Sequence, residues 1–253
     1  MSIKKHIPNV ITLLNLSAGI FALIHAFNGN YNEAFSCVCV GIFFDFWDGF
    51  VARLLKVQSP LGVQLDSLAD MVTSGVVPGV VMYKMLADIQ ENQPDYNLTP
   101  ETFYMGIVPY LGFLITLGSC YRLAKFNIDT RQTDSFIGLP TPANALFIMS
   151  LPMILFDNQF EALSNLLSNP YVLVGISLFS AYILNAEIPL FSLKVKYFSW
   201  ANNKTQVIFM LISALFLVFF QYLGIPMIIL FYVLLSVITN KMGTNNGSPY
   251  KAN

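Results

Sequence analysis

Four aspartates interrupt the second and third apolar stretches of the chain: Asp45, Asp48, Asp66 and Asp70. An ionised carboxylate at membrane depth costs at least ~2.5–3.5 kcal/mol, so four of them together require cations as partners. On helices, spacings of three and four residues place each pair on one face, and two antiparallel neighbours can present all four to one point. Oxygen ligands without a nearby His or Cys favour Mg²⁺, Mn²⁺ or Ca²⁺ over zinc. We therefore predict a site for two divalent cations.

Small residues and one arginine accompany these acids. Gly49 and Ala52 lie on the same helical stripe as the first acidic pair, where small side chains leave room for a ligand. Gly62 lies four residues before Asp66, so it leaves the corresponding helical stripe of the second acidic pair free of a side chain. Arg53 stands near the end of its apolar segment, where its planar guanidinium can meet a phosphate. Metal-binding acids, an arginine for phosphate and an uncluttered surface between them indicate metal-assisted phosphoryl transfer.

The composition indicates that a membrane positions these residues. Of 253 residues, 55% are hydrophobic and 11% are charged, and the mean hydropathy is +0.62, whereas soluble domains are about 25% charged. A formal net charge of −1 offers no basic surplus, so we expect no nucleic-acid partner. Three cysteines in apolar runs lack metal-ligand spacing. We predict an all-α, polytopic membrane helix bundle, with residues 1–253 forming a single domain.

Eight apolar segments approach the roughly 20 residues that cross ~30 Å of hydrocarbon. They cover approximately residues 9–28, 33–55, 62–88, 103–125, 142–156, 170–188, 206–222 and 225–240. The fifth and eighth are short, and only Leu223 and Gly224 divide the last two. Gly75, Pro78 and Gly79 in the third segment are predicted to serve close packing or a kink.

The distribution of basic residues agrees with eight crossings. On that topology only Lys84 lies on one side, and the opposite side holds Lys4, Lys5, Arg53, Lys56, Arg122, Lys125, Arg131, Lys194, Lys196, Lys204, Lys241 and Lys251. Lys and Arg concentrate in cytoplasmic loops. We therefore predict a multi-pass protein of the cytoplasmic (inner) membrane, with both termini and the reactive site facing the cytoplasm.

Written as a pattern, Asp45-x2-Asp48-Gly49-x2-Ala52-Arg53-x8-Gly62-x3-Asp66-x3-Asp70 resembles, without a departure, the signature of the CDP-alcohol phosphotransferases. The resemblance implies a CMP-releasing enzyme that holds the pyrophosphate of a CDP-activated lipid on two divalent metals, Mg²⁺ or Mn²⁺, while an alcohol attacks the phosphorus bearing the lipid. It makes all four acids metal ligands, makes Asp70 also the general base, and implies a homodimer. Residues expected near the CDP group are Asn9, Thr12, Asp48, Gly49, Ala52, Arg53 and Gly62.

Two further stretches, residues 121–127 and 136–143, resemble those of the bacterial and archaeal phosphatidylserine synthases within that family. This resemblance implies transfer of the phosphatidyl group from CDP-diacylglycerol to the hydroxyl of L-serine, giving phosphatidylserine and CMP. Arg122 or Lys125 could hold the serine carboxylate by charge-assisted hydrogen bonds. The serine site is expected within residues 121–143 together with one residue of the first helix; its members are Asn15, Arg122, Lys125, Asn127, Phe136, Gly138, Leu139 and Pro140.

Other readings of these residues stay open. Glycerol 3-phosphate or an inositol phosphate could be the acceptor, although its phosphate would want more basic residues than Arg122, Lys125 and Arg131. A cation-coupled transporter could use the four acids as its ion site and would show flux without chemistry. Asn9, Thr12 and Asn15 could serve only helix–helix hydrogen bonding. The basic residues at helix ends could act only as topology markers.

Overall fold

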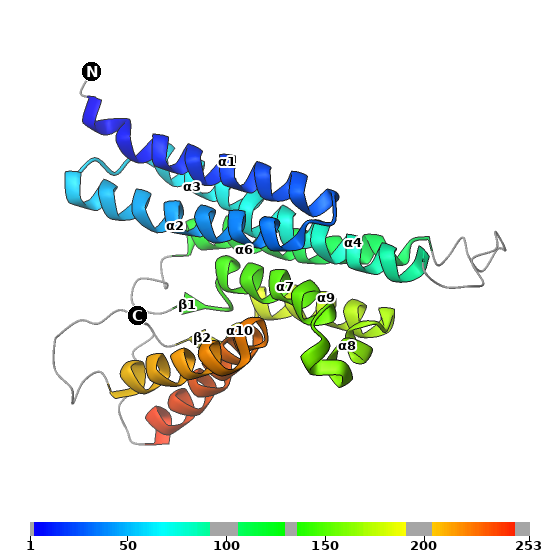
Figure 1. Ribbon diagram of the computed structural model, residues 1–253. Helices are drawn as coiled ribbons and strands as arrows, with labels where there is room; N and C mark the ends of the chain where they lie inside the picture. Colours follow the sequence, from blue (N-terminus) through cyan, green and yellow to red (C-terminus); the bar gives the residue numbers. More distant parts are fainter. Residues whose placement is uncertain (1–2, 92–105, 130–135, 191–203, 246–253) are drawn as a thin grey trace.

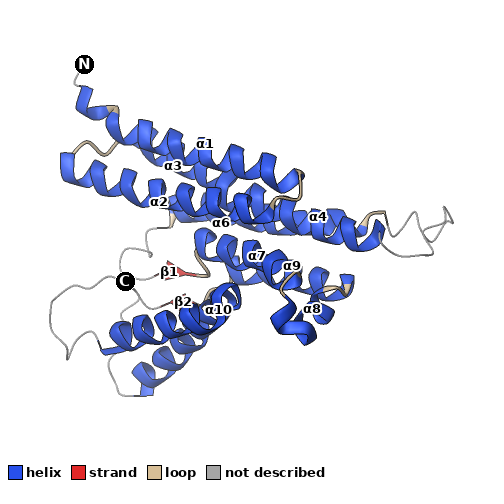
Figure 2. Cartoon of the chain, in the orientation of Figure 1, coloured by secondary structure: helices blue, strands red, loops and turns tan. Residues whose placement is uncertain are grey.

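The computed structural model describes residues 3–91, 106–129, 136–190 and 204–245, and these ranges are mostly helical, with one short strand pair and short connecting loops (Figures 1 and 2). The predicted all-α fold is thus confirmed. Arg131, Lys194, Lys196 and Lys251, used above for orientation, lie outside the described residues. The α-helices are α1 (Ile7–Phe27), α2 (Tyr31–Leu55), α3 (Pro60–Asp70), α4 (Val77–Glu91), α6 (Leu114–Ile128), α7 (Thr141–Leu155), α8 (Glu161–Leu167), α9 (Pro170–Asn185) and α10 (Lys204–Asn245).

Short elements join and extend these helices. A π-helix, Met71–Val76, connects α3 to α4 without a break, and a 3₁₀-helix, Val108–Phe113, leads into α6. Two more 3₁₀ turns cover Ile3–Lys5 and Asn158–Phe160. The strands β1 (Phe136–Ile137) and β2 (Pro189–Leu190) pair antiparallel and join the α6–α7 connection to the chain after α9.

Helix α4 runs through the buried centre of the bundle, whereas α3 is mostly exposed or half-buried. The buried side chains of α4 include Val77, Val81 and Met82, which pack with Ile148 and Met149 of α7 in one apolar core. Large apolar side chains point outward instead on α1, α2 and α10, including Phe46 at 64% exposure and Val218 at 74%. Such a surface suits hydrocarbon, because soluble proteins rarely expose contiguous apolar area on this scale.

Four helical segments in the described part of the chain are long and apolar enough to cross a membrane: Ile7–Phe27, Tyr31–Leu55, Pro60–Ile89 and Gln206–Thr239. A fifth is obtained if α8 and α9, bent by 79° at their junction, count as one broken span. This establishes four or five candidate spans; the described parts of the eight expected segments are mostly helical, but eight crossings are not established.

The C-terminal helix α10 is a hairpin. Gln221 has φ 46° and ψ −118°, which no helix residue adopts, and the rings of Phe209 and Phe231 on its two sides stack with centroids 5.9 Å apart. Figure 1 shows the two arms side by side. A Cβ at Gly224 would lie 2.5 Å from the carbonyl oxygen of Phe216, so this position needs glycine. The turn was expected at Leu223 and Gly224; it begins at Gln221.

One end of the bundle collects the elements that carry the predicted site. The start of α1, the α2–α3 connection, β1, β2 and both ends of the α10 hairpin all lie there, at the left of Figure 1. The α1–α2 connection and α8 lie at the other end. The short helix α8 was not expected from the sequence, because its seven residues lack the length of an apolar span.

Candidate active site

The predicted convergence of acidic side chains is present. Helix α1 packs against both α2 and α3, and the carboxylates project from α2 and α3 into the space between them. Oxygen atoms of Asp45, Asp48 and Asp66 lie within 4.8 Å of one another. Asp70, one turn after Asp66, interacts electrostatically with all three. Two helices, with α1 packed against both, thus bring four acidic groups together.

Two neutral side chains donate hydrogen bonds to these acids in the described part of the chain, and both come from α1. The Thr12 hydroxyl lies 2.5 Å from Asp48 Oδ2 and donates to it, with the carbonyl oxygen of Pro8 at 3.1 Å as the longer alternative. Asn15 Nδ2 donates to Asp70 Oδ1 over 3.1 Å. Both α1 residues are buried. Thr12 and Asn15, three residues apart on α1, therefore contact one acid on α2 and one at the end of α3.

The acid cluster is short of positive charge. Asp66 Oδ1 is buried and has no hydrogen-bond partner among the described residues, and a buried unpaired carboxylate oxygen is costly. Arg53 and Arg122 act on the cluster electrostatically, on Asp48 and Asp70 respectively. A hard divalent cation is the partner that carboxylate oxygens select. The donor set therefore fits Mg²⁺ or Mn²⁺.

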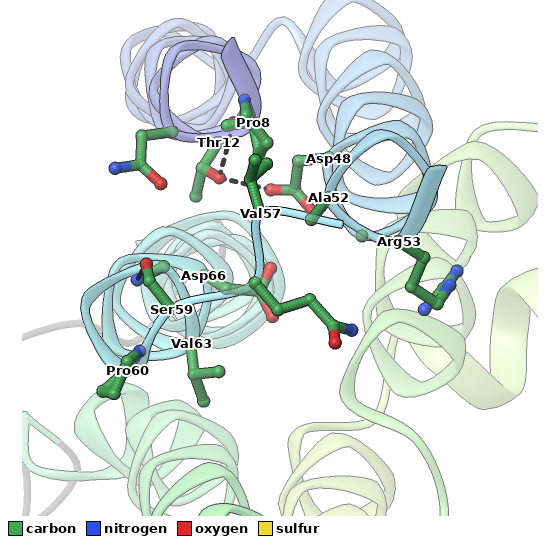
Figure 3. A pocket seen from close by; sticks show the side chains of 14 residues that line it. Pro8, Thr12, Asp48, Ala52, Arg53, Val57, Ser59, Pro60, Val63 and Asp66 are labelled. Atoms are coloured by element: carbon green, nitrogen blue, oxygen red, sulfur yellow. Dashed lines mark hydrogen bonds between the residues drawn. The ribbon is translucent and has the colours of Figure 1, made fainter. Parts of the chain in front are cut away.

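A cavity of about 490 Å³ opens beside the acids. Figure 3 shows Asp48 of α2 and Asp66 of α3 facing it, with Arg53 extending outward from α2. Every residue that was expected near the CDP group lines this cavity: Asn9, Thr12, Asp48, Gly49, Ala52, Arg53 and Gly62. The structure thus gathers the seven from three helices around one space. Their contact with CDP stays a prediction.

The glycines of the pattern are explained by this geometry. A Cβ at Gly62 would lie 3.3 Å from Ser59 Oγ and 3.4 Å from Asn9 Oδ1, so the polar groups of α1 and α3 come close here. At Gly49 a Cβ would meet only the Arg53 guanidinium, at 3.6 Å. Gly49 therefore keeps the cavity wall open, whereas Gly62 permits close approach of two helices.

The α2–α3 connection supplies lining residues that the sequence reading missed. Lys56 ends α2 in the left-handed conformation, with φ 54°, and Ser59 Oγ accepts the backbone N–H of Gly62 to cap α3. Ser59 followed by proline is a recognisable helix-start signal, so these residues could have been identified. The additional lining residues are Pro8, Val57, Gln58, Ser59, Pro60 and Val63. The cavity is also lined by Asp66, which like Asp48 is an expected metal ligand.

Arg122 is a buried basic residue that acts electrostatically on Asp70. It is 6% exposed, its Nε donates to the carbonyl oxygen of Leu139 over 2.7 Å, and its guanidinium lies 5.5 Å from the Phe126 ring centroid. Nη2 is buried and has no hydrogen-bond partner among the described residues. Since unpaired buried donors are costly, Nη2 is available to an anionic ligand beside Asp70.

The predicted loop at residues 136–140 holds the Arg122 partner in place. Gly138 has φ 74°, its N–H donates to the carbonyl oxygen of Ile188, and a Cβ would lie 2.5 Å from the carbonyl oxygen of Leu184. The backbone of Phe136 pairs with Leu190. Pro140 follows as the N-cap of α7. This loop is therefore fastened to the chain after α9, an attachment that no local sequence signal predicts.

Two other expected serine-site side chains, Lys125 and Asn127, have protein partners. Lys125 Nζ forms an exposed ion pair with Glu187 at 3.1 Å. Asn127 Nδ2 donates to Ser67 Oγ over 2.9 Å, which ties the end of α6 to α3. Within this set Asn15 donates to Asp70, and Arg122 acts on Asp70 electrostatically. Serine contact by any of them stays a prediction.

Comparison with known proteins gives the context for this arrangement. A CDP-diacylglycerol--serine O-phosphatidyltransferase of Bacillus subtilis (strain 168) is 33% identical over 151 residues, covering 58% of this chain and 75% of the relative. The protein of the same name from Helicobacter pylori (strain ATCC 700392 / 26695) is 30% identical over 201 residues, covering 75% and 74%. An archaetidylserine synthase of Methanothermobacter thermautotrophicus is 29% identical over 159 residues, covering 62% and 61%.

The family profile described as CDP-alcohol phosphatidyltransferase matches residues 5–182. The match runs from the start of α1 almost to the end of α9, so it includes the four acids, the cavity and the loop that fixes Arg122. The chain is a membrane-helix protein that belongs to the CDP-alcohol phosphatidyltransferase family.

Proposed function

We propose that this protein transfers the phosphatidyl group of CDP-diacylglycerol to the hydroxyl of L-serine, giving phosphatidylserine and CMP. One observation carries the proposal: the acid cluster borders a cavity of about 490 Å³ lined by all seven residues expected near CDP. Arg122, which acts electrostatically on Asp70, also has a buried donor without a hydrogen-bond partner among the described residues. Two of the three relatives are named as serine O-phosphatidyltransferases, which supports serine as the acceptor. The third is named as an archaetidylserine synthase, the archaetidyl counterpart of a phosphatidylserine synthase.

The donor would lie in the cavity with its pyrophosphate toward the acids. Arg53 at the rim is suited to a phosphate oxygen, because its guanidinium lies over Gly49, where no side chain intervenes. The amino-terminal end of α3 also faces the cavity and favours negative charge. Bound Mg²⁺ or Mn²⁺ on Asp45, Asp48, Asp66 and Asp70 would neutralise the pyrophosphate and stabilise CMP as it leaves.

Asp70 is proposed as the general base. Its carboxylate would take the proton of the serine hydroxyl while the serine oxygen forms a bond to the phosphorus that bears the lipid. The bond from that phosphorus to the CMP oxygen breaks, and CMP leaves with the electron pair. Arg122 Nη2 is the proposed donor to the serine carboxylate, which would orient the hydroxyl beside Asp70. Positioning and electrostatics supply most of the rate in such a site.

The finer membrane arrangement belongs to the same proposal. Eight crossings, both termini in the cytoplasm, location in the inner membrane and a homodimer are proposed, with residues 1–253 forming one catalytic domain. The clustering of the α1 start, the α2–α3 connection and the β1–β2 pair at one end supports a single reactive face. A cysteine placed at Lys4 or Lys56 should then be labelled only from the cytoplasmic side.

An acceptor panel tests the proposal. Purified protein in liposomes receives CDP-diacylglycerol, Mg²⁺ or Mn²⁺, and one acceptor: L-serine, glycerol 3-phosphate or an inositol phosphate. Of the three acceptors, we expect only L-serine to support CMP release, with phosphatidylserine formed in equal amount. Release with a phosphate-bearing acceptor would assign the same chemistry to another alcohol. Cation flux with no CMP under any condition would favour a transporter.

A further inference from the structure

The chain changes helix type immediately after Asp70. Residues Met71–Val76 form a π-helix between α3 and α4. Short π-helical turns are rare and are frequent at functional sites. Two hydroxyls join this turn to its neighbours: Thr116 Oγ1 donates to the carbonyl oxygen of Gly75 over 3.0 Å, and Thr73 Oγ1 donates to the carbonyl oxygen of Asn15 over 3.2 Å.

The bond made by Thr73 is unlike those of most helix hydroxyls here. Ser177 and Thr239 donate to the carbonyl four residues earlier in their own helix, at 2.9 Å in both cases, which is the ordinary habit of such side chains. Thr73 reaches across to α1 instead. It is completely buried, so its hydroxyl has no water as an alternative partner.

Two glycines make room for this contact. A Cβ at Gly19 of α1 would collide with Thr73 Oγ1, and one at Gly41 of α2 would lie 2.6 Å from Thr73 Cγ2. The hydroxyl and the methyl of Thr73 thus occupy separate notches on two helices. Only a β-branched side chain with one hydroxyl fills both, so the position is specified more tightly than apolar packing requires.

Asn15 connects this contact to Asp70. Its backbone carbonyl accepts the Thr73 hydroxyl, and its side-chain Nδ2 donates to Asp70 Oδ1 over 3.1 Å. Asn15 is completely buried. We propose that Thr73 is a positioning residue, which holds Asn15 on α1 so that the Asn15 amide fixes the direction of the Asp70 carboxylate. This inference rests on the role proposed above for Asp70.

Two variants at one position separate the hydroxyl from the packing. Thr73→Val keeps the branched shape and loses the hydrogen bond, whereas Thr73→Ser keeps the hydroxyl and loses the methyl group. We expect kcat of Thr73→Val to fall about five- to ten-fold, the scale of one net hydrogen bond. KM for L-serine and for CDP-diacylglycerol should stay within about two-fold of the parent values. Thr73→Ser should retain most of kcat.

The matched control is Thr239→Val, the same change at a hydroxyl in α10 that bonds only within its helix. It should leave kcat unchanged. A double-mutant cycle with Asn15→Ala tests whether Thr73 acts through Asn15. If it does, the double variant Thr73→Val/Asn15→Ala should have a kcat less than about two-fold below that of Asn15→Ala alone. If the loss of kcat in the double variant equals the product of the two single losses, Thr73 does not act through Asn15, and the proposal is overturned.

The outcomes distinguish this inference from the proposed function. No CMP release by the parent protein contradicts the proposed function. A parent that turns over serine, with Thr73→Val equally fast or slowed only in parallel with Thr73→Ser, overturns the positioning role alone. If Thr73→Val does not yield folded protein, Gly19→Ala displaces the same hydroxyl from the other side. The same loss of kcat is expected there, and unchanged kcat would overturn the role.

Discussion

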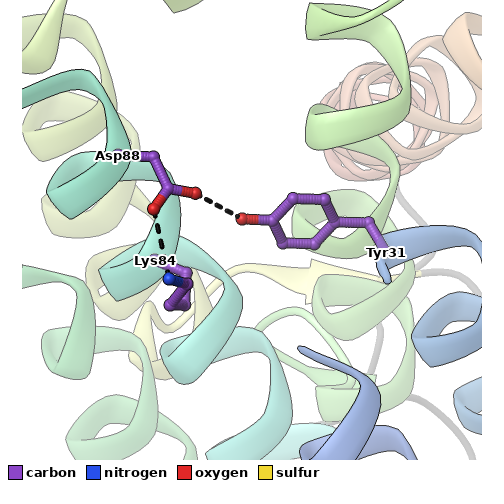
Figure 4. Close-up of polar contacts among 3 residues, drawn as sticks. All are labelled: Tyr31, Lys84 and Asp88. Carbon is purple, nitrogen blue, oxygen red and sulfur yellow. Dashed lines mark hydrogen bonds and ion pairs between the residues drawn. The ribbon is translucent and has the colours of Figure 1, made fainter. Parts of the chain in front are cut away.

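Acidic side chains occur at both ends of the helix bundle, and the two groups differ in how they are satisfied. At the α1–α2 connection, Asp88 accepts a hydrogen bond from Tyr31 over 3.0 Å and forms an ion pair with Lys84 at 3.2 Å (Figure 4). At the other end, two neutral side chains of α1 donate to two of the four acids, and Asp66 keeps a buried oxygen without a partner among the described residues (Figure 3).

The difference separates a structural contact from a site. The Asp88 group neutralises its charge within the protein and needs no ligand. The four-acid cluster does not, although leaving buried carboxylates unpaired is expensive. Protein structures tolerate such a cost where a ligand supplies the missing charge. The comparison therefore predicts that the two groups respond in opposite ways to loss of one carboxylate.

The largest expected effect is on turnover. Asp66→Asn or Asp70→Asn should lower CMP release by at least about 10²–10⁴-fold, because each removes a negative ligand or the proposed base. Asp88→Asn should leave the rate within about two-fold, since surface ion pairs contribute little. Serine-dependent CMP release measures both. Turnover by Asp70→Asn at the parent rate would remove that residue from the mechanism.

Asp70→Asn should also differ in kind from the other acid variants. Three acids remain to hold a divalent ion, so this variant should still bind CDP-diacylglycerol when Mg²⁺ is present. Calorimetry with the variant in nanodiscs measures that binding. Loss of all donor binding would show that Asp70 serves the metals first and the proton second.

A smaller effect is expected at Arg122. If Nη2 holds the serine carboxylate, Arg122→Ala should raise the KM for serine by roughly ten- to a hundred-fold, the scale of one charge-assisted bond. The KM for CDP-diacylglycerol should change far less. Serine methyl ester, which lacks the carboxylate charge, is the control: it should be a poor acceptor for the parent and lose little more with the variant.

Other changes in kcat and KM of Arg122→Ala would assign Arg122 a different role. A fall in kcat with both KM values unchanged would mean that Arg122 serves as counter-charge to Asp70. A weaker KM for CDP-diacylglycerol with serine unaffected would assign Arg122 to the donor side.

The smallest effect is on stability. Tyr31→Phe removes the hydroxyl that donates to Asp88 and should destabilise the protein by about 0.5–1.5 kcal/mol, the net scale of one hydrogen bond. Thermal unfolding in detergent should show a slightly lower Tm, and kcat should not change. A clear loss of turnover in Tyr31→Phe would mean that this end of the bundle also takes part in the reaction.

Most of the candidate site could be predicted from the sequence because its spacing is local. Asp45 and Asp48 lie within one turn, as do Asp66 and Asp70, and helix geometry alone places each pair on one face. Gly49, Ala52 and Arg53 belong to the same stripe. Helix periodicity therefore predicted much of the cavity wall.

The contacts that cross between distant segments could not be predicted. Arg122 meets the carbonyl of Leu139, a loop that β2 and the end of α9 hold in place, and the partner of Lys125 is Glu187. Neither follows from local pattern. The π-helix could not be predicted from the sequence either, because Gly75 and Pro78 indicated only close packing or a kink. Hydropathy found the eight apolar helical segments, but it did not establish how many of them cross a membrane.

Binding of Mn²⁺ tests most directly whether the four acids form the divalent-ion site on which the proposed reaction depends. Electron paramagnetic resonance of the purified protein titrated with Mn²⁺ counts bound ions without any turnover. We predict saturable binding that Asp66→Asn reduces strongly and Asp88→Asn leaves intact, because Asp88 has an ion pair with Lys84 whereas no described cation forms an ion pair with the four-acid cluster. Equal Mn²⁺ binding by the parent and Asp66→Asn would contradict the account.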